Sequence, residues 1–119
     1  INPDYYKAWC DRAYILTRLN RHKQALSSCD KALELKPDSH EAWNVRGLLS
    51  NRRQEALTCF EKALEIQPDY ARAWYNRGLS LFRLGKHELA LDCFQKALEI
   101  KPNSQEFWHP QAWYGRGYM

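Results

Sequence analysis

The chain has 119 residues, of which 45% are apolar and 27% charged, and its formal net charge is +4. This composition suits a folded protein with a core of its own and excludes a disordered, highly charged chain. No apolar run approaches the roughly 18 residues of a membrane span, and no signal-peptide pattern opens the chain.

Segments with apolar residues at helical spacing follow one another along the chain and alternate between two kinds. Those of the first kind open with Ala-Trp and carry Gly or Ala four residues after the Trp. Those of the second kind contain Ala-x-x-x-(Phe or Cys), then Lys-Ala-Leu-Glu, then Pro. The spacing predicts that each segment is an amphipathic helix. In chain order the segments are 8–15, 24–37, 42–49, 55–68, 73–80, 89–102 and 112–119.

Turn-forming residues separate these segments. Inside each pair stands a residue type that tolerates the left-handed conformation that ends a helix. These residues are Asn20, Asn51 and Gly85. The prolines expected to stop the second helix of each pair are Pro37, Pro68 and Pro102. The N-caps expected to follow them are Asp38, Asp69 and Asn103.

The pattern repeats with a period of 34 residues, as from Trp9 to Trp43 or from Pro68 to Pro102. This period, the Trp and small residue, the Ala-x-x-x-Phe and the closing Pro resemble the tetratricopeptide repeat family. The resemblance covers essentially the whole chain. It implies an all-α fold, a right-handed α-solenoid of stacked antiparallel helix hairpins with a concave surface. One departure recurs, because Arg stands before the small residue where the family often has Leu. These arginines are Arg12, Arg46, Arg77 and Arg116.

The chain is therefore expected to form a single repeat array. Residues 1–3 match the end of a preceding repeat, and neither end shows the polar capping helix that solenoids normally need. We accordingly expect this chain to be a window on a longer array. The predicted units are 4–37 for repeat 1, 38–68 for repeat 2, 69–102 for repeat 3, and 103–119 for an irregular linker with part of a further first helix.

Two places depart from the period. Seven residues lead from Gly78 to Gly85, but four lead from Gly47 to Asn51, so the last turn of the second repeat's first helix is missing. The final unit restarts its motif five residues late. We predict that residues are missing from one or both places, a turn at the first and nearly a whole repeat at the second. A true deletion of three residues is also tolerable, because it nearly preserves helical phase. The two places are 47–52 and 107–111.

Nothing in the pattern predicts catalysis. The cysteines show no zinc-type spacing and are expected to pack as small free hydrophobes, which fits a reducing, cytoplasmic setting. Two histidines hold equivalent repeat positions, which favours a structural role. No metalloprotease, phosphate-loop or nucleophile-elbow motif occurs. We therefore predict no catalytic residue, metal site or cofactor. The residues considered were Cys10, Cys29, Cys59, Cys93, His22, His40, His87 and His109.

In this family the first helices line a groove that holds a partner's peptide or helix. The resemblance implies candidate groove positions two residues before, one after and five after each motif Trp. Their mixture of amide, aromatic, aliphatic and charged side chains suits a specific peptide. The alternative is that some of them pack against neighbouring repeats. The candidates are Lys7, Cys10, Tyr14, Glu41, Asn44, Leu48, Arg72, Tyr75, Leu79, Gln111, Tyr114 and Tyr118.

One specialised use of that groove is not matched. Chaperone-binding members of the family hold a C-terminal carboxylate with Lys and Asn on the first helix of the first repeat. Cys10 and Tyr14 occupy those positions here. The sequence therefore does not predict binding to chaperone tails.

Basic residues cluster around the turns between first and second helices, and stacking would align them as one edge. Such a basic edge attracts nucleic acid or an acidic protein. The favoured alternative is that cations near helix C-termini complement the helix dipole and keep the edge solvated. These residues are Arg18, Arg21, Lys23, Arg52, Arg53, Arg83 and Lys86.

The leading functional prediction is a non-catalytic scaffold for protein–protein interaction that binds a partner in its groove. A first alternative is nucleic-acid or acidic-partner binding along the basic edge. A second is a regulatory or targeting module of a longer chain with an enzyme domain elsewhere. No membrane partner is predicted.

Overall fold

The computed structural model describes residues 5–100. Within that range the chain forms six α-helices and no strand, which confirms the predicted all-α fold. The predicted segment 112–119 lies outside the described residues. The helices are α1 (Tyr5–Arg18), α2 (His22–Leu35), α3 (His40–Leu49), α4 (Arg53–Ile66), α5 (Ala71–Arg83) and α6 (His87–Ile100).

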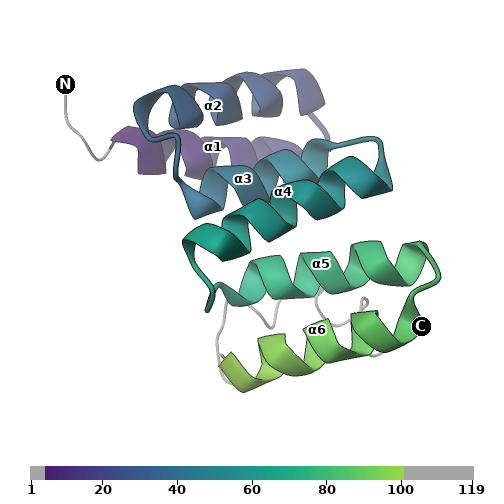
Figure 1. Ribbon diagram of the computed structural model, residues 1–119. Coiled ribbons are helices and arrows are strands. Elements are labelled where there is room, and N and C mark those ends of the chain that lie inside the picture. Colours follow the sequence, from purple (N-terminus) through teal and green to yellow (C-terminus); the bar gives the residue numbers. More distant parts are fainter. Residues whose placement is uncertain (1–4, 101–119) are drawn as a thin grey trace.

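The helices form three antiparallel hairpins, α1–α2, α3–α4 and α5–α6, stacked one on the next (Figure 1). The hairpins fall within the predicted units 4–37, 38–68 and 69–102. The first helices contact one another along the stack, α1 with α3 and α3 with α5, more extensively than the second helices do. The stack therefore curves with α1, α3 and α5 on its inner side, as the solenoid prediction requires.

The motif Trp and the closing Pro interact at each joint between hairpins. Helices α2 and α4 end two residues before Pro37 and Pro68, because a proline disfavours the helical conformation in the residue before it. The indole Nε1 of Trp43 then donates to the carbonyl of Pro37 at 3.0 Å. Trp74 repeats this bond to Pro68 at 2.8 Å. Helices α3 and α5 are thereby tied to the turns that precede them.

The small residue of each first helix allows a close approach to the second helix. A Cβ added to Gly78 would stand 2.7 Å from Cε1 of Phe94, which is closer than real contacts allow. Gly47 meets the ring of Phe60 in the same way. The first hairpin has Ala at the glycine position and Cys29 in place of the Phe. The smaller thiol leaves room for the Ala methyl group, so volume is conserved across the pair.

The recurrent Arg links neighbouring hairpins. A guanidinium nitrogen of Arg46 lies 2.7 Å from the carboxylate of Asp30, on the second helix of the preceding hairpin. Arg77 lies 3.2 Å from Glu61 in the equivalent pair. These pairs are partly exposed, so each contributes at most about 1 kcal/mol. The departure from the family pattern thus adds a contact between repeats.

The predicted N-caps were wrong by one residue. Ser39 caps α3, and its Oγ accepts a hydrogen bond from the backbone N–H of Ala42 at 3.3 Å. Tyr70 stands at the N-cap of α5 without a side-chain cap bond. Asp38 and Asp69 lie instead within the turns, where backbone hydrogen bonds delay the helix start. Asn103 lies outside the described residues.

The turn inside each hairpin follows the prediction in two cases out of three. Asn20 and Gly85 have φ of 62° and 83°, in the left-handed region. Asn51 does not share it, because α3 ends early and Ser50 is extended (φ −74°, ψ 136°). Helix α3 has 10 residues, against 14 in α1 and 13 in α5. The Ser50 N–H donates to the carbonyl of Gly47 at 3.2 Å, so the short turn closes as a tolerable deletion would. Residues 107–111 lie outside the described range.

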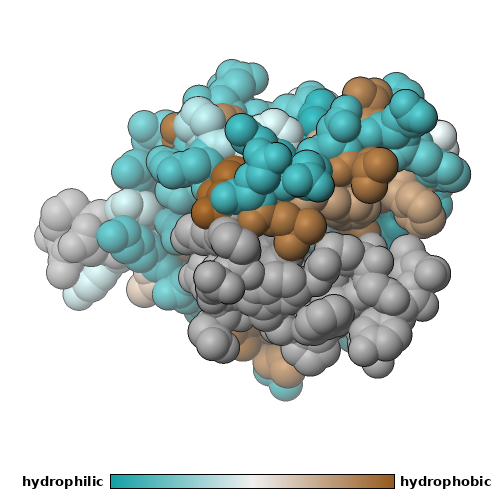
Figure 2. Space-filling view, turned by 90° about the horizontal axis from the view of Figure 1, so that it is seen from below, coloured by the Kyte–Doolittle hydropathy of each residue, from teal (hydrophilic) through white to brown (hydrophobic). Residues whose placement is uncertain are grey.

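Small side chains make up much of the interior. Ala13, Ala32, Ala63 and Ala97 are fully buried, which lets the helices pack closely. Several larger apolar side chains remain accessible, and Figure 2 shows apolar groups gathered near the middle of a mostly hydrophilic described surface. None of the described helices is both long and apolar enough to cross a membrane.

Candidate functional site

Three predicted groove residues are buried, and all stand one residue after the motif Trp. Cys10, Asn44 and Tyr75 are 3%, 1% and 7% exposed. Because the first helices lie against one another, this position faces a neighbouring element rather than an open groove. Tyr75, for example, packs on Phe94 with ring centroids 5.7 Å apart. The alternative that some candidates pack against neighbouring repeats is therefore correct for Cys10 and Asn44, whereas Tyr75 packs on the second helix of its own hairpin.

Polar partners satisfy the two buried residues of the first pair of hairpins. The amide oxygen of Asn44 accepts a hydrogen bond from Nδ2 of Asn76 at 2.9 Å, which joins α3 to α5. The Cys10 thiol lies 3.5 Å from Oγ of Ser39. The idea that Asn44 pairs with a peptide backbone is not supported, because its side chain is buried and already bonds Asn76 between α3 and α5. Sequence reasoning missed Asn76, and no recurring residue type marks its position two residues after the Trp.

The other described candidates are accessible and come from all three first helices. Positions two before and five after the Trp therefore define the accessible row of the inner layer. Lys7 is exposed, and the half-buried members are Tyr14, Glu41, Leu48, Arg72 and Leu79. Gln111, Tyr114 and Tyr118 lie outside the described residues.

The fold brings two of these candidates together from distant hairpins. The Arg72 guanidinium carbon of α5 lies 4.9 Å from the ring centroid of Tyr14 on α1, a cation–π contact that spans α3. Arg18 donates a hydrogen bond to the Tyr14 hydroxyl at 3.2 Å. The inner layer is thus curved enough for the first and third hairpins to touch.

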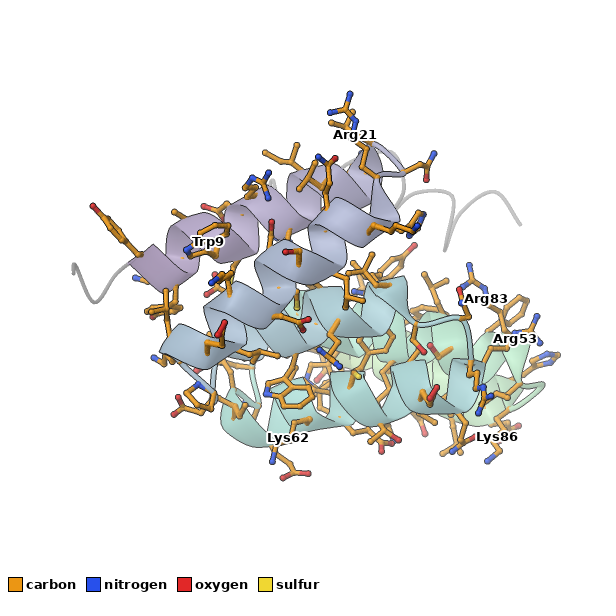
Figure 3. The ribbon with its side chains drawn as sticks, turned by 90° about the horizontal axis from the view of Figure 1, so that it is seen from above. Trp9, Arg21, Arg53, Lys62, Arg83 and Lys86 are labelled. Atoms are coloured by element: carbon orange, nitrogen blue, oxygen red, sulfur yellow. The ribbon has the colours of Figure 1, made fainter. Side chains whose placement is uncertain are left out.

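The predicted basic edge is exposed throughout. Its residues are Arg18, Arg21, Lys23, Arg52, Arg53, Arg83 and Lys86. Arg53, Arg83 and Lys86 extend outward at one end of the molecule, and Arg21 lies apart from them (Figure 3). Within residues 5–100 none of the seven forms an ion pair, whereas Arg46 and Arg77 on the hairpin bodies do. No carboxylate of residues 5–100 therefore neutralises the edge through an ion pair.

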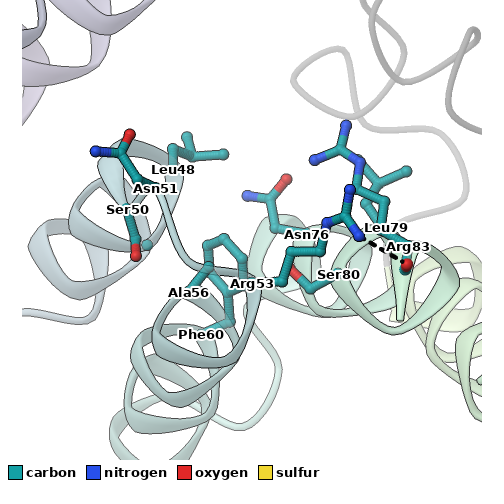
Figure 4. A pocket seen from close by; sticks show the side chains of 11 residues that line it. Leu48, Ser50, Asn51, Arg53, Ala56, Phe60, Asn76, Leu79, Ser80 and Arg83 are labelled. Atoms are coloured by element: carbon teal, nitrogen blue, oxygen red, sulfur yellow. Dashed lines mark hydrogen bonds between the residues drawn. The ribbon is translucent and has the colours of Figure 1, made fainter. Parts of the chain in front are cut away.

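A pocket of about 280 Å³ lies beside the short turn between α3 and α4 (Figure 4). We call it the short-turn pocket. Leu48 and Leu79, both predicted groove residues, form part of its wall. Its remaining lining residues are Gly47, Ser50, Asn51, Arg53, Ala56, Phe60, Asn76, Ser80 and Arg83. The sequence signal for this pocket was the second repeat's shortness.

Burial shifts the pKa of the four cysteines and of His40 within residues 5–100. Burial raises the pKa of the Cys29 thiol to about 12 and also raises the pKa of Cys10, Cys59 and Cys93. These thiols stay protonated near neutral pH, where only a thiolate would be a nucleophile. Burial lowers the pKa of His40. In the part of the chain that the structure describes, no three His, Cys, Asp or Glu residues gather as metal ligands.

Solved structures of similar fold were found. A crystal structure of MamA is 24% identical with a TM-score of 0.69, covering 85% of this chain and 61% of that one. The first TPR of Spaghetti (RPAP3), bound to the HSP90 peptide SRMEEVD, is 18% identical with a TM-score of 0.75, covering 89% and 86%. YrrB, described as a TPR protein with an unusual peptide-binding site, is 29% identical with a TM-score of 0.67, covering 82% and 52%. The chain therefore spans less than two thirds of the MamA and YrrB structures.

A comparison with curated proteins found no match. The family model described as tetratricopeptide repeat matches residues 6–39 and 71–104. A second model, described as TPR repeat, matches residues 49–85. Together with the hairpin stack, these matches show that the chain belongs to the tetratricopeptide repeat family.

Proposed function

We propose that this chain is a non-catalytic scaffold that holds a peptide or helix of a partner protein against its inner layer. The observation that carries the proposal is the accessible row of side chains on α1, α3 and α5. It combines both signs of charge with aromatic and aliphatic groups on rigid helices, as specific peptide recognition requires.

Two of the similar structures support a peptide as the ligand. The first TPR of Spaghetti is bound to an HSP90 peptide, and YrrB is described as having a peptide-binding site. For this chain we do not propose the chaperone tail itself. Cys10, at one clamp position, is buried, and Tyr14, at the other, is engaged by Arg18 and Arg72.

A charge exchange in the row tests the proposal. The variant Lys7→Glu/Glu41→Lys keeps the net charge and alters only accessible positions. Its matched control is Lys31→Glu/Glu34→Lys, an exchange within an exposed ion pair on α2. The tagged chain is used in a pull-down at moderate salt, and recovered proteins are identified by mass spectrometry. A partner recovered by wild type and control but lost with the row variant is the expected result.

The basic edge favours a second candidate, nucleic-acid binding. Its seven cations are exposed and form no ion pair with carboxylates of residues 5–100. In that case the recovered material is nucleic acid, its recovery falls steeply with added salt, and the row variant retains it. The double variant Arg21→Glu/Lys86→Glu would then abolish binding, and the peptide-scaffold proposal would fail.

A further inference from the structure

The short-turn pocket exists because the second hairpin lacks a turn. In the other hairpins a buried leucine stands four residues before the left-handed turn residue, Leu16 at 8% and Leu81 at 3% exposure. The residue four before Asn51 is Gly47, which already packs on Phe60. Helix α3 therefore has no side chain at the place that Leu16 and Leu81 fill in the other hairpins. The space remains open between the end of α3 and the second half of α5.

The pocket combines an apolar wall with two guanidinium groups. Leu48, Leu79 and Phe60 supply the apolar surface, and none of the lining residues is acidic. Arg53 and Arg83 reach the same side of the pocket, and Nη1 of Arg53 donates to the backbone carbonyl of Arg83 at 3.2 Å (Figure 4). Within residues 5–100 no carboxylate pairs with either guanidinium. The site is therefore positively charged next to an apolar wall.

Both guanidinium groups lie at the C-terminal end of α5. Arg83 belongs to the last turn of α5, where a cation is favourable. Arg53 is the first residue of α4, but its Nη1 bonds the carbonyl of Arg83, so its charge also lies at this favourable end. Two cations side by side next to an apolar wall, with no paired carboxylate within residues 5–100, attract an anionic ligand.

The dimensions limit what that ligand can be. A concavity of about 280 Å³ has room for one large side chain of a partner. Leu48 and Leu79 belong both to the pocket and to the accessible row. A segment lying along the row can therefore place one side chain in the pocket.

We propose that the short-turn pocket anchors an aliphatic or aromatic side chain of a partner protein, with an adjacent acidic residue bound by Arg53 and Arg83. The inference rests on the proposed scaffold function and names the chemistry of its ligand. The positive charge selects the acidic residue, and the apolar wall selects its neighbour.

Synthetic peptides provide the probe. One set has a central Leu or Phe flanked by Asp, and two matched sets replace Asp with Lys or the central residue with Gly. Binding to the purified chain is measured by fluorescence polarisation. The acidic set with an apolar centre should bind best. Equal binding of the three sets would overturn the inference.

Filling the pocket gives the sharpest variant. Inserting Leu-Phe-Arg between Leu49 and Ser50 restores the repeat length and places a leucine four residues before Asn51. It should weaken the best peptides about ten- to a hundredfold, as expected when one apolar side chain can no longer be buried. Circular dichroism and thermal unfolding check that the insertion folds. Unchanged affinity in a folded insertion variant would contradict the proposal.

Charge reversal gives a second variant, which leaves the length of the chain unchanged. Arg83→Glu should weaken the Asp-flanked peptides by about tenfold and leave the Lys-flanked peptides no weaker. Arg21→Glu, an exposed arginine of the first hairpin, is the matched control. If both arginine variants weaken binding equally, or an oligonucleotide displaces every peptide alike, the edge is a general anion-binding surface and the pocket is not specific.

The two proposals fail separately. If the row variant loses its partner while the insertion and Arg83→Glu variants bind normally, the scaffold function stands and the pocket inference falls. If the pocket variants lose binding while the row variant retains it, the pocket is the anchor and the row is not the binding surface.

Discussion

The second and third hairpins have the same motif but differ at one end. They are alike over most of their length, because Trp43 and Trp74 make the same indole bond at the proline turn, and farther along each first helix a glycine meets a phenylalanine ring. At the other end α5 continues to Arg83 and a left-handed Gly85, whereas α3 stops at Leu49 and has no left-handed residue. The pocket lies at this second end.

The difference shows which part of the repeat carries stability and which part is free to vary. The proline end holds the interhairpin bond, and the closest packing is the glycine–phenylalanine contact, so these residues recur. The turn residues Asn20, Asn51 and Gly85 are exposed, and a helical turn can be lost beside them without loss of the fold. Such a loss opens surface that a partner can use.

The largest expected effect concerns the glycine–phenylalanine contact. Phe60→Ala should lower the free energy of unfolding by about 3–5 kcal/mol, because Phe60 is only 2% exposed and truncation leaves a cavity. Chemical denaturation measures the change. The comparison variant is Cys29→Ala, at the same repeat position, which removes one sulfur atom and should cost clearly less. Equal losses would mean that the two positions do not play the same role.

Cys29 also makes stability depend on alkaline pH. Its pKa is raised by burial from 9.0 to about 12, so the unfolded chain loses this proton at lower pH than the folded chain does. The thiol's contribution is therefore intact below about pH 9 and is lost as pH rises toward 12, by up to about 1.4 kcal/mol per pH unit. Denaturation between these pH values should show a smaller slope for Cys29→Ala than for wild type. Parallel slopes would argue against burial of the thiol.

The glycine contact should give a smaller effect. Overpacking at Gly78→Ala costs about 1–3 kcal/mol, and the gain in helix propensity offsets about 1 kcal/mol, leaving a net loss of about 1 kcal/mol. The penalty should disappear in a Phe94→Cys background, which reproduces the pairing of Ala13 with Cys29. A double-mutant cycle measures this coupling, and additive effects would show that Gly78 and Phe94 act independently.

The turn end should be the least sensitive and should differ between hairpins. Gly85→Ala places a side chain at φ 83° and should cost about 1 kcal/mol. Asn51→Ala, at the equivalent but ordinary turn position, should change stability by less than about 0.5 kcal/mol. Thermal unfolding compares the two. A larger loss at Asn51 would mean that the short turn contributes more than its geometry indicates.

The fold was predictable because the repeat is built from local signals. Helical periodicity, a Trp and small residue on one helix, and a proline after the next predict three hairpins without any long-range information. The incorrect predictions of helix N-caps also concerned local structure. Asp38 and Asp69 were expected as caps, but Ser39 and Tyr70 hold those places because the turns close one residue later.

The candidate site was predictable only in outline. The sequence by itself determined the helix hairpins, and its resemblance to the family implied that the first helices line a groove. It could not tell which side chains of those helices stay accessible, because that depends on the curvature of the stack. Only the tertiary structure buried Asn44 against Asn76 and brought Arg72 over Tyr14 across an intervening helix. The three-residue shortage was visible in the sequence. That it opens a pocket was decided by packing, because neighbouring helices keep their spacing when one of them ends early.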